Sequence, residues 1–69
     1  MLRTDNDKLI KKIGEKGLTI VEVAEKLGID RATFYRRLKN NSFRISDVQK
    51  LSEILDLDGE EAAFIFLVA

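Results

Sequence analysis

The stretch "LTIVEVAEKLGIDRATFYRRLKNN", residues 18–41, decides the fold of this chain of 69 residues. It predicts two short helices, at 19–27 and 31–39, with only "GID" between them. Gly28 tolerates the positive φ that ends the first helix, and Ile29 offers an apolar side chain for the corner between the two. Two short helices joined by a short turn that contains glycine form a helix-turn-helix arrangement.

Both of these helices carry end signals. Thr19 and Glu22 fit a capping box, in which the Thr hydroxyl and the Glu carboxylate each accept a hydrogen bond from the other residue's backbone amide. Asp30 is placed to cap the second helix. Asn40-Asn41 follows that helix, and asparagine is second only to glycine in tolerating left-handed backbone.

The same kinds of signal predict three further helices. Either Thr4 or Asp5 caps the first helix of the chain. Ser46 with Gln49 forms a second capping box, and Asp58 caps the last helix. The five predicted helices cover residues 5–16, 19–27, 31–39, 46–55 and 59–67. We therefore expect an all-α, compact five-helix fold.

Apolar residues recur at the spacing of one helix face within the predicted helices. The predicted core consists of Leu9, Ile10, Ile13, Val23, Ala24, Leu27, Phe34, Leu38, Val48, Leu51, Ile54 and Leu55. Ala24 is small at the point where the two helices of the pair must approach closely. The length is that of one domain, over residues 1–69, with a thin core.

The net charge of zero conceals a strong asymmetry. Residues 1–44 carry eleven basic and six acidic residues, a net +5, whereas 45–69 carry one basic and six acidic residues, a net −5. Within 31–44 there are five basic residues and no acidic one. Such a separation indicates one end that binds a polyanion and another that is solvated or faces a partner, although a basic run is also common on a merely solvated face.

The composition argues against an enzyme, a metal site and a cofactor. The chain has no cysteine and no histidine, which removes the usual zinc ligands, the Ser-His-Asp arrangement and thiol nucleophiles. Glu60 and Glu61 are adjacent, so they point about 100° apart on a helix and form no catalytic pair. The longest apolar run, "AAFIFLVA" at 62–69, is far shorter than the roughly 20 residues that span a bilayer, and the polar start "MLRTDNDK" has no signal-peptide pattern, so we expect a cytoplasmic protein.

The helix at 31–39 presents a basic face once its core residues, Phe34 and Leu38, are placed inward. The residues that remain outward are Arg31, Ala32, Tyr35, Arg36 and Lys39, with Thr33 and Arg37 at the flanks. A helix-turn-helix places this second helix in the major groove of double-stranded DNA. The same spacing also occurs in ordinary helical hairpins that have an exposed basic side.

At these residues the chain resembles the lambda-repressor-like class, the phage Cro and repressor domains and their bacterial relatives. The residues that match its helix-turn-helix pattern are Thr19, Val23, Ala24, Lys26, Leu27 and Gly28. The five-helix layout resembles the class over nearly the whole chain. Its end, "EEAAFIFLVA", is similar to a small phage and prophage subgroup with an apolar fifth helix. The resemblance implies a DNA-binding transcription regulator that acts by occupying its operator.

Three positions depart from the pattern of that class. Ile20 stands where most members have a glutamine that helps to hold a phosphate, which removes one expected contact. Asn40-Asn41 replaces the glycine that often follows the recognition helix. Phe34 and Leu38 are four residues apart where many members have three, so the register along this helix is open by about one residue.

Four residues are predicted to meet base edges, namely Arg31, Ala32, Tyr35 and Arg36. Arg31 lies in the first turn, where it pairs with guanine or clamps a phosphate. Ala32 touches a thymine methyl group or only permits close approach. Tyr35 contacts a sugar or a base, or else covers the edge of the core. Arg36, one turn further along, is the second candidate for base reading.

Backbone phosphates are predicted to be held by Thr19, Thr33, Arg37, Lys39 and Arg44. Thr19 presents the amino end of its helix, whose free amides favour an anion. Thr33 serves either a phosphate or the cap of its own helix. Lys8, Lys11 and Lys12 are instead expected to form a solvated face of the first helix.

The end of the chain offers a candidate interface for a homodimer. Its apolar residues are Phe64, Ile65, Phe66, Leu67 and Val68. One side of this helix covers the core, and the other is expected to leave an exposed patch, although packing of the whole segment into the core is equally open. An alternative function is a protein-interaction module, antirepressor-like or antitoxin-like, that binds a partner through this helix. In that case DNA affinity is weak.

Overall fold

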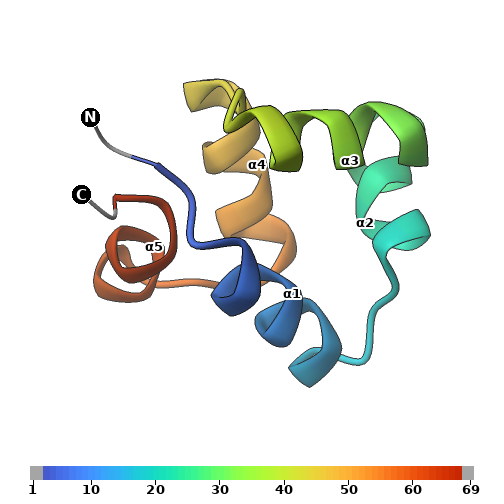
Figure 1. The fold of residues 1–69 in the computed structure, drawn as a ribbon. Helices are drawn as coiled ribbons and strands as arrows, with labels where there is room; N and C mark the ends of the chain where they lie inside the picture. Colours follow the sequence, from blue (N-terminus) through green and yellow to red (C-terminus); the bar gives the residue numbers. More distant parts are fainter. Residues whose placement is uncertain (1–2, 68–69) are drawn as a thin grey trace.

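The computed structural model describes residues 3–67, and these fold into five helices (Figure 1). The helices are α1 (Asn6–Glu15), α2 (Ile20–Leu27), α3 (Arg31–Asn40), α4 (Ile45–Ile54) and α5 (Gly59–Phe66). The predicted all-α five-helix fold is confirmed, and each predicted boundary lies within one residue of the observed one. In Figure 1, α2 and α3 meet at a corner on one side of the molecule and α5 lies on the other. Among the described residues no helix is long and apolar enough to cross a membrane.

Most of the predicted helix caps are present. The side chains of Asp5, Thr19, Asp30 and Asp58 each accept a hydrogen bond from a backbone amide in the first turn of the helix that follows. The Thr19–Glu22 capping box is formed in both directions, at 3.2 and 3.0 Å. These caps satisfy amides that have no partner within the helix, so local sequence defines where the helices begin.

The start of α4 differs from the prediction. Ser46 was expected to cap this helix, but α4 begins one residue earlier and Arg44 occupies the capping position. The arginine side chain has no acceptor atom, so the cap is one-sided: Asp47 Oδ2 accepts a hydrogen bond from the Arg44 amide at 3.0 Å. The carboxylate of Asp47, the third residue of α4, therefore takes the place of the predicted Ser46 cap.

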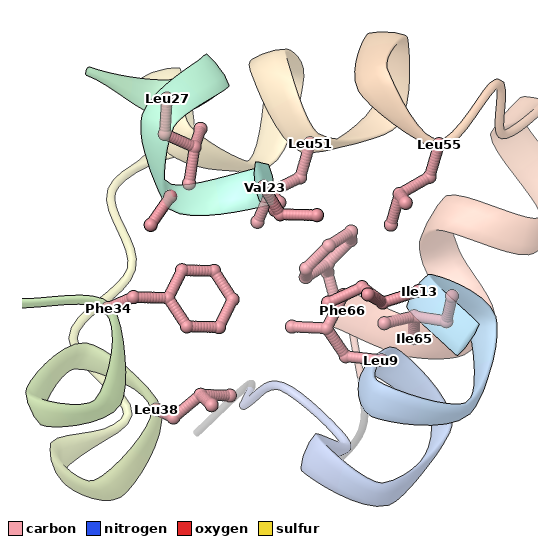
Figure 2. Packing of buried hydrophobic residues seen from close by; sticks show 11 residues of the cluster. Leu9, Ile13, Val23, Leu27, Phe34, Leu38, Leu51, Leu55, Ile65 and Phe66 are labelled. Atoms are coloured by element: carbon pink, nitrogen blue, oxygen red, sulfur yellow. The ribbon is translucent and has the colours of Figure 1, made fainter. Parts of the chain in front are cut away.

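Every helix contributes buried apolar side chains to one core (Figure 2). Its buried residues are Leu9, Ile13, Val23, Ala24, Leu27, Phe34, Leu38, Leu51, Leu55, Ile65 and Phe66. Phe34 is fully buried and reaches from α3 into the middle of this cluster, so α3 is anchored at its centre. The prediction was wrong for Ile10, which is 45% exposed because it lies on the side of α1 away from the core.

The segment before α1, together with the first residue of α1, ties two distant helices together. The Thr4 amide donates to Asn41 Oδ1 at 2.9 Å, and Asn6 Nδ2 donates to the Leu38 carbonyl at 3.1 Å. The Asp5 amide donates to the carbonyl of Ile65 at 2.7 Å. The carboxyl end of α3 is therefore held by the amino-terminal segment, which is itself held by α5.

An ion pair joins α1 to α5. Lys12 Nζ lies 2.8 Å from Glu61 Oε2 and 3.7 Å from Glu15 Oε1. The hydrogen bond from Lys12 holds the pKa of Glu61 below its usual value, and the same bond raises the pKa of Lys12. Lys12 was expected to form a solvated face together with Lys8 and Lys11, but its side chain instead links α1 to α5.

Candidate nucleic-acid interface

The exposed face of α3 has the composition that the sequence predicts. Its core side is Phe34 and Leu38, at 0% and 6% exposure. Besides the terminal Asn40, the exposed residues are Arg31, Ala32, Tyr35, Arg36 and Lys39. The last four of them are spaced as i, i+3, i+4 and i+7, which places them along one side of a helix. A convex strip with three cations and one aromatic ring therefore faces solvent.

The corner between α2 and α3 is fixed by the backbone. Gly28 has a φ of 81° and its amide donates to the carbonyl of Glu25 at 3.0 Å. The Ile29 amide donates to the carbonyl of Ala24, also at 3.0 Å. This pair of bonds is a Schellman motif, which ends α2 and turns the chain sharply into α3. Ile29 packs against the core and Ala24 is buried, as predicted.

The amino end of α3 carries an ionised cap. Asp30 accepts a hydrogen bond from the Thr33 amide at 2.8 Å. The hydrogen bonds from the hydroxyl and amide of Thr33 hold the pKa of Asp30 below its usual value, and the positive charge of Arg36 adds to this effect. Thr33 is thus engaged in capping, one of its two predicted roles. The carboxylate places one negative charge beside the exposed strip.

The amino end of α2 is exposed at Thr19. Its hydroxyl accepts from the Glu22 amide, and Glu22 Oε1 accepts from the Thr19 amide. The capping box therefore puts a carboxylate at the helix end that was predicted to attract a phosphate. An anion approaching here meets the dipole of α2 together with the negative charge of Glu22.

The predicted phosphate contacts on α3 and the next turn separate into two groups. Lys39 and Arg44 are exposed, and Arg44 lies in the turn between α3 and α4. Arg37 differs, because its Nη1 donates to Asp47 Oδ2 at 2.9 Å and its side chain is only 17% exposed. Its guanidinium is thus directed toward α4, and this placement does not support the predicted phosphate contact.

Asp47 is a feature that sequence reasoning missed. The charge separation along the sequence groups Asp47 with the solvated acids of the second half, but the residue is 7% exposed. The available signal was its position three residues after Arg44, where a carboxylate closes back onto a helix start. Ile45 was also overlooked, and at 79% exposure it is an unusually open apolar side chain beside Arg44.

The fifth helix divides its apolar residues between two sides. Ile65 and Phe66 are 3% and 5% exposed, so they pack in the core, the alternative left open for this segment, and offer little free surface to a dimer. Phe64 and Leu67 are 64% and 56% exposed and remain candidates. Val68 lies outside the described residues. Beside Phe64 an open groove runs between α1 and α5, and Lys8 Nζ lies 3.3 Å from the centre of the Phe64 ring.

The corner between α2 and α3 lies in a region that matches a known protein family. A family model described as a Cro/C1-type HTH DNA-binding domain matches residues 8–62. The match includes the whole of α2, α3 and α4, and with them the exposed strip of α3 and the Arg44 turn. No curated protein and no solved structure matches the chain.

Proposed function

The chain belongs to the family of Cro/C1-type helix-turn-helix DNA-binding domains, and we propose that it is a sequence-specific transcription regulator that acts by occupying an operator. The observation that carries the proposal is the exposed basic strip of α3, held outward by the buried Phe34 and Leu38. Occupancy requires no covalent step. We place the protein with the Cro-like and repressor-like regulators of phages and prophages, acting in the cytoplasm.

In the proposed complex α3 enters the major groove with its amino-terminal half against the bases. Arg31 and Arg36 have the geometry to donate to the O6 and N7 atoms of guanine. Ala32 and Tyr35 lie between them on the same strip, where a methyl group and a ring meet thymine methyls or sugars. Asp30, ionised at neutral pH, disfavours a phosphate at this end and favours a base with a hydrogen-bond donor.

Phosphates on either side of the groove hold the domain in register. Lys39 lies at the carboxyl end of the strip, and Arg44 lies in the next turn. Thr19 presents its hydroxyl group at the opposite flank. Such contacts orient a domain without reading sequence, and they make binding depend steeply on salt.

Sequence-specific binding by so small a domain normally uses two copies on half-sites about 34 Å apart. We propose that the homodimer forms through the exposed side of α5, with Phe64 and Leu67 at its centre. Phe64 lies in the last turn of α5 and Leu67 follows the helix directly, so these two large exposed apolar side chains lie at the same end of α5. Replacing Phe64 with serine is expected to abolish the dimer without unfolding the domain. Analytical ultracentrifugation with and without DNA measures this directly.

The first experiment is a selection from random duplexes at low salt, followed by sequencing of what the purified protein retains. An enriched inverted repeat supports a sequence-reading dimer and supplies the operator. An enriched single half-site supports base reading without the dimer. Retention without enrichment, or no retention, contradicts the proposed function.

A second candidate is a protein-interaction module, favoured by the exposed Phe64 and the acidic residues Glu60 and Glu61 near it. A double variant, Arg31→Glu with Arg36→Glu, distinguishes the two functions. It is expected to abolish DNA binding while leaving the capture of a protein partner unchanged. If the variant retains full DNA binding, the basic strip is not the DNA-binding surface.

A further inference from the structure

A single carboxylate oxygen links the recognition helix to the turn that follows it. Asp47 Oδ2 accepts from Arg37 Nη1 at 2.9 Å and from the Arg44 amide at 3.0 Å. The side chains of Arg37 and Asp47 are 17% and 10% exposed. One atom at the start of α4 thus holds both the last turn of α3 and the backbone of Arg44.

The turn between α3 and α4 is held at its other end as well. Asn41 has a φ of 52°, and the Ser42 amide donates to the carbonyl of Arg37 at 2.9 Å. Asn41 Oδ1 in turn accepts from the Thr4 amide. Residues 41–44 are therefore held at both ends, and Arg37 takes part at each of them, by its carbonyl and by its guanidinium.

From this geometry we propose that Arg37 and Asp47 are positioning residues, which hold the 41–44 turn in the shape that brings Arg44 to a phosphate, and that neither of them contacts DNA. The proposal rests on the proposed function, because it concerns the same DNA-binding surface. It removes Arg37 from the cations that were predicted to contact phosphates. Arg37 and Asp47 together carry no net charge, so their contribution to affinity comes from shape.

The alternative is that Arg37 leaves Asp47 and contacts a phosphate directly. That movement deprives a largely buried carboxylate of its cation, which costs more than an exposed phosphate contact contributes. It also leaves a negative charge close to the DNA backbone. The two models predict opposite changes in DNA affinity when the negative charge of Asp47 is removed.

The test is Asp47→Asn, which keeps the size of the side chain and removes its charge. The dissociation constant for the selected operator is measured at several salt concentrations. The positioning role predicts binding about fivefold weaker, the difference between a charge-assisted and a neutral hydrogen bond, with the slope of log K against log salt reduced by up to about 0.9. This loss is expected although the variant is more positive than the original chain.

A direct phosphate contact by Arg37 predicts the reverse, equal or tighter binding with an equal or steeper salt slope, and that result overturns the proposal. Glu53→Gln is the matched control, because it removes an exposed acid from the same helix. It is expected to leave binding unchanged or slightly tighter. If the unaltered protein binds no duplex, the proposed function itself is wrong. Failure of the positioning role is a different result, because it is read from the difference in binding between the variants and the unaltered protein.

A double-mutant cycle decides the question if Asp47→Asn does not fold. Arg37→Met, Arg44→Gln and the double variant are compared at a temperature where far-ultraviolet circular dichroism shows each of them folded. If Arg37 acts by placing Arg44, then Arg44→Gln weakens binding in the original chain and adds nothing once Arg37 is replaced. Independent, additive losses overturn the proposal.

Discussion

The replacement Arg36→Ala separates the two main consequences of the fold, stability and recognition. Arg36 lies on the exposed strip of α3, and among the described residues it takes part in no ion pair or side-chain hydrogen bond. Its removal should therefore change the free energy of unfolding by no more than about 0.5 kcal/mol, the usual range for an exposed site. A base-reading contact by the same side chain contributes about 1–3 kcal/mol of discrimination.

The expected loss of affinity for the selected operator is thus about 5- to 150-fold. Binding is measured by fluorescence anisotropy on the operator and on duplexes with each substitution at every position. A base reader predicts that the variant loses its preference at one position and keeps it elsewhere, with little change in the salt slope. Urea denaturation monitors stability in parallel.

The matched control is Lys50→Ala, which removes one exposed cation from the acidic half. It is expected to weaken binding only through the small change in net charge. The reasoning is refuted if Arg36→Ala and Lys50→Ala have the same effect. A uniform loss across all duplexes, with the salt slope reduced by about 0.9, assigns Arg36 to a phosphate and contradicts its role as a base reader.

Three further predictions concern the fold that presents this strip. Phe34→Ala should lower the free energy of unfolding by about 3–5 kcal/mol in urea titrations, since Phe34 is fully buried at the centre of the core; a loss below about 1 kcal/mol would contradict its central place. Gly28→Ala should cost about 1 kcal/mol or more, because φ is 81° there, and a neutral result in the same titration would contradict the left-handed turn. Glu61 has its pKa lowered in the folded chain, so its stabilisation is present above the usual value of 4.5 and lost as pH falls through the folded pKa; thermal unfolding across that range should show a pH dependence that Glu61→Gln reduces.

The helices and the corner between α2 and α3 were predictable because their signals are local. Thr19, Asp30 and Asp58 each lie within three residues of the amide that they cap. Gly28 likewise lies where left-handed backbone is required. Such interactions depend only on neighbours along the chain, so their pattern is legible without knowing how the helices pack.

The start of α4 shows where local reasoning goes astray. Ser46 has the chemistry of a cap, but Asp47 is the residue that closes onto the helix start. Arg37, ten residues earlier, pairs its guanidinium with the same carboxylate, so a contact between two helices adds to the observed register. A cap that is also half of an ion pair between two helices is not recognisable from the capping residues alone.

By itself the sequence determined five helices, the outward strip of α3 and the separation of charge between the two halves, since each follows from residue type and periodicity. The tertiary structure alone decided which apolar residues at the end of the chain are buried. Ile65 and Phe66 are buried, whereas Phe64 and Leu67 are exposed. It also decided that Arg37 faces a carboxylate. The physical reason is that burial and ion pairing depend on how helices far apart in the chain are rotated and shifted against one another, and no local signal carries that information.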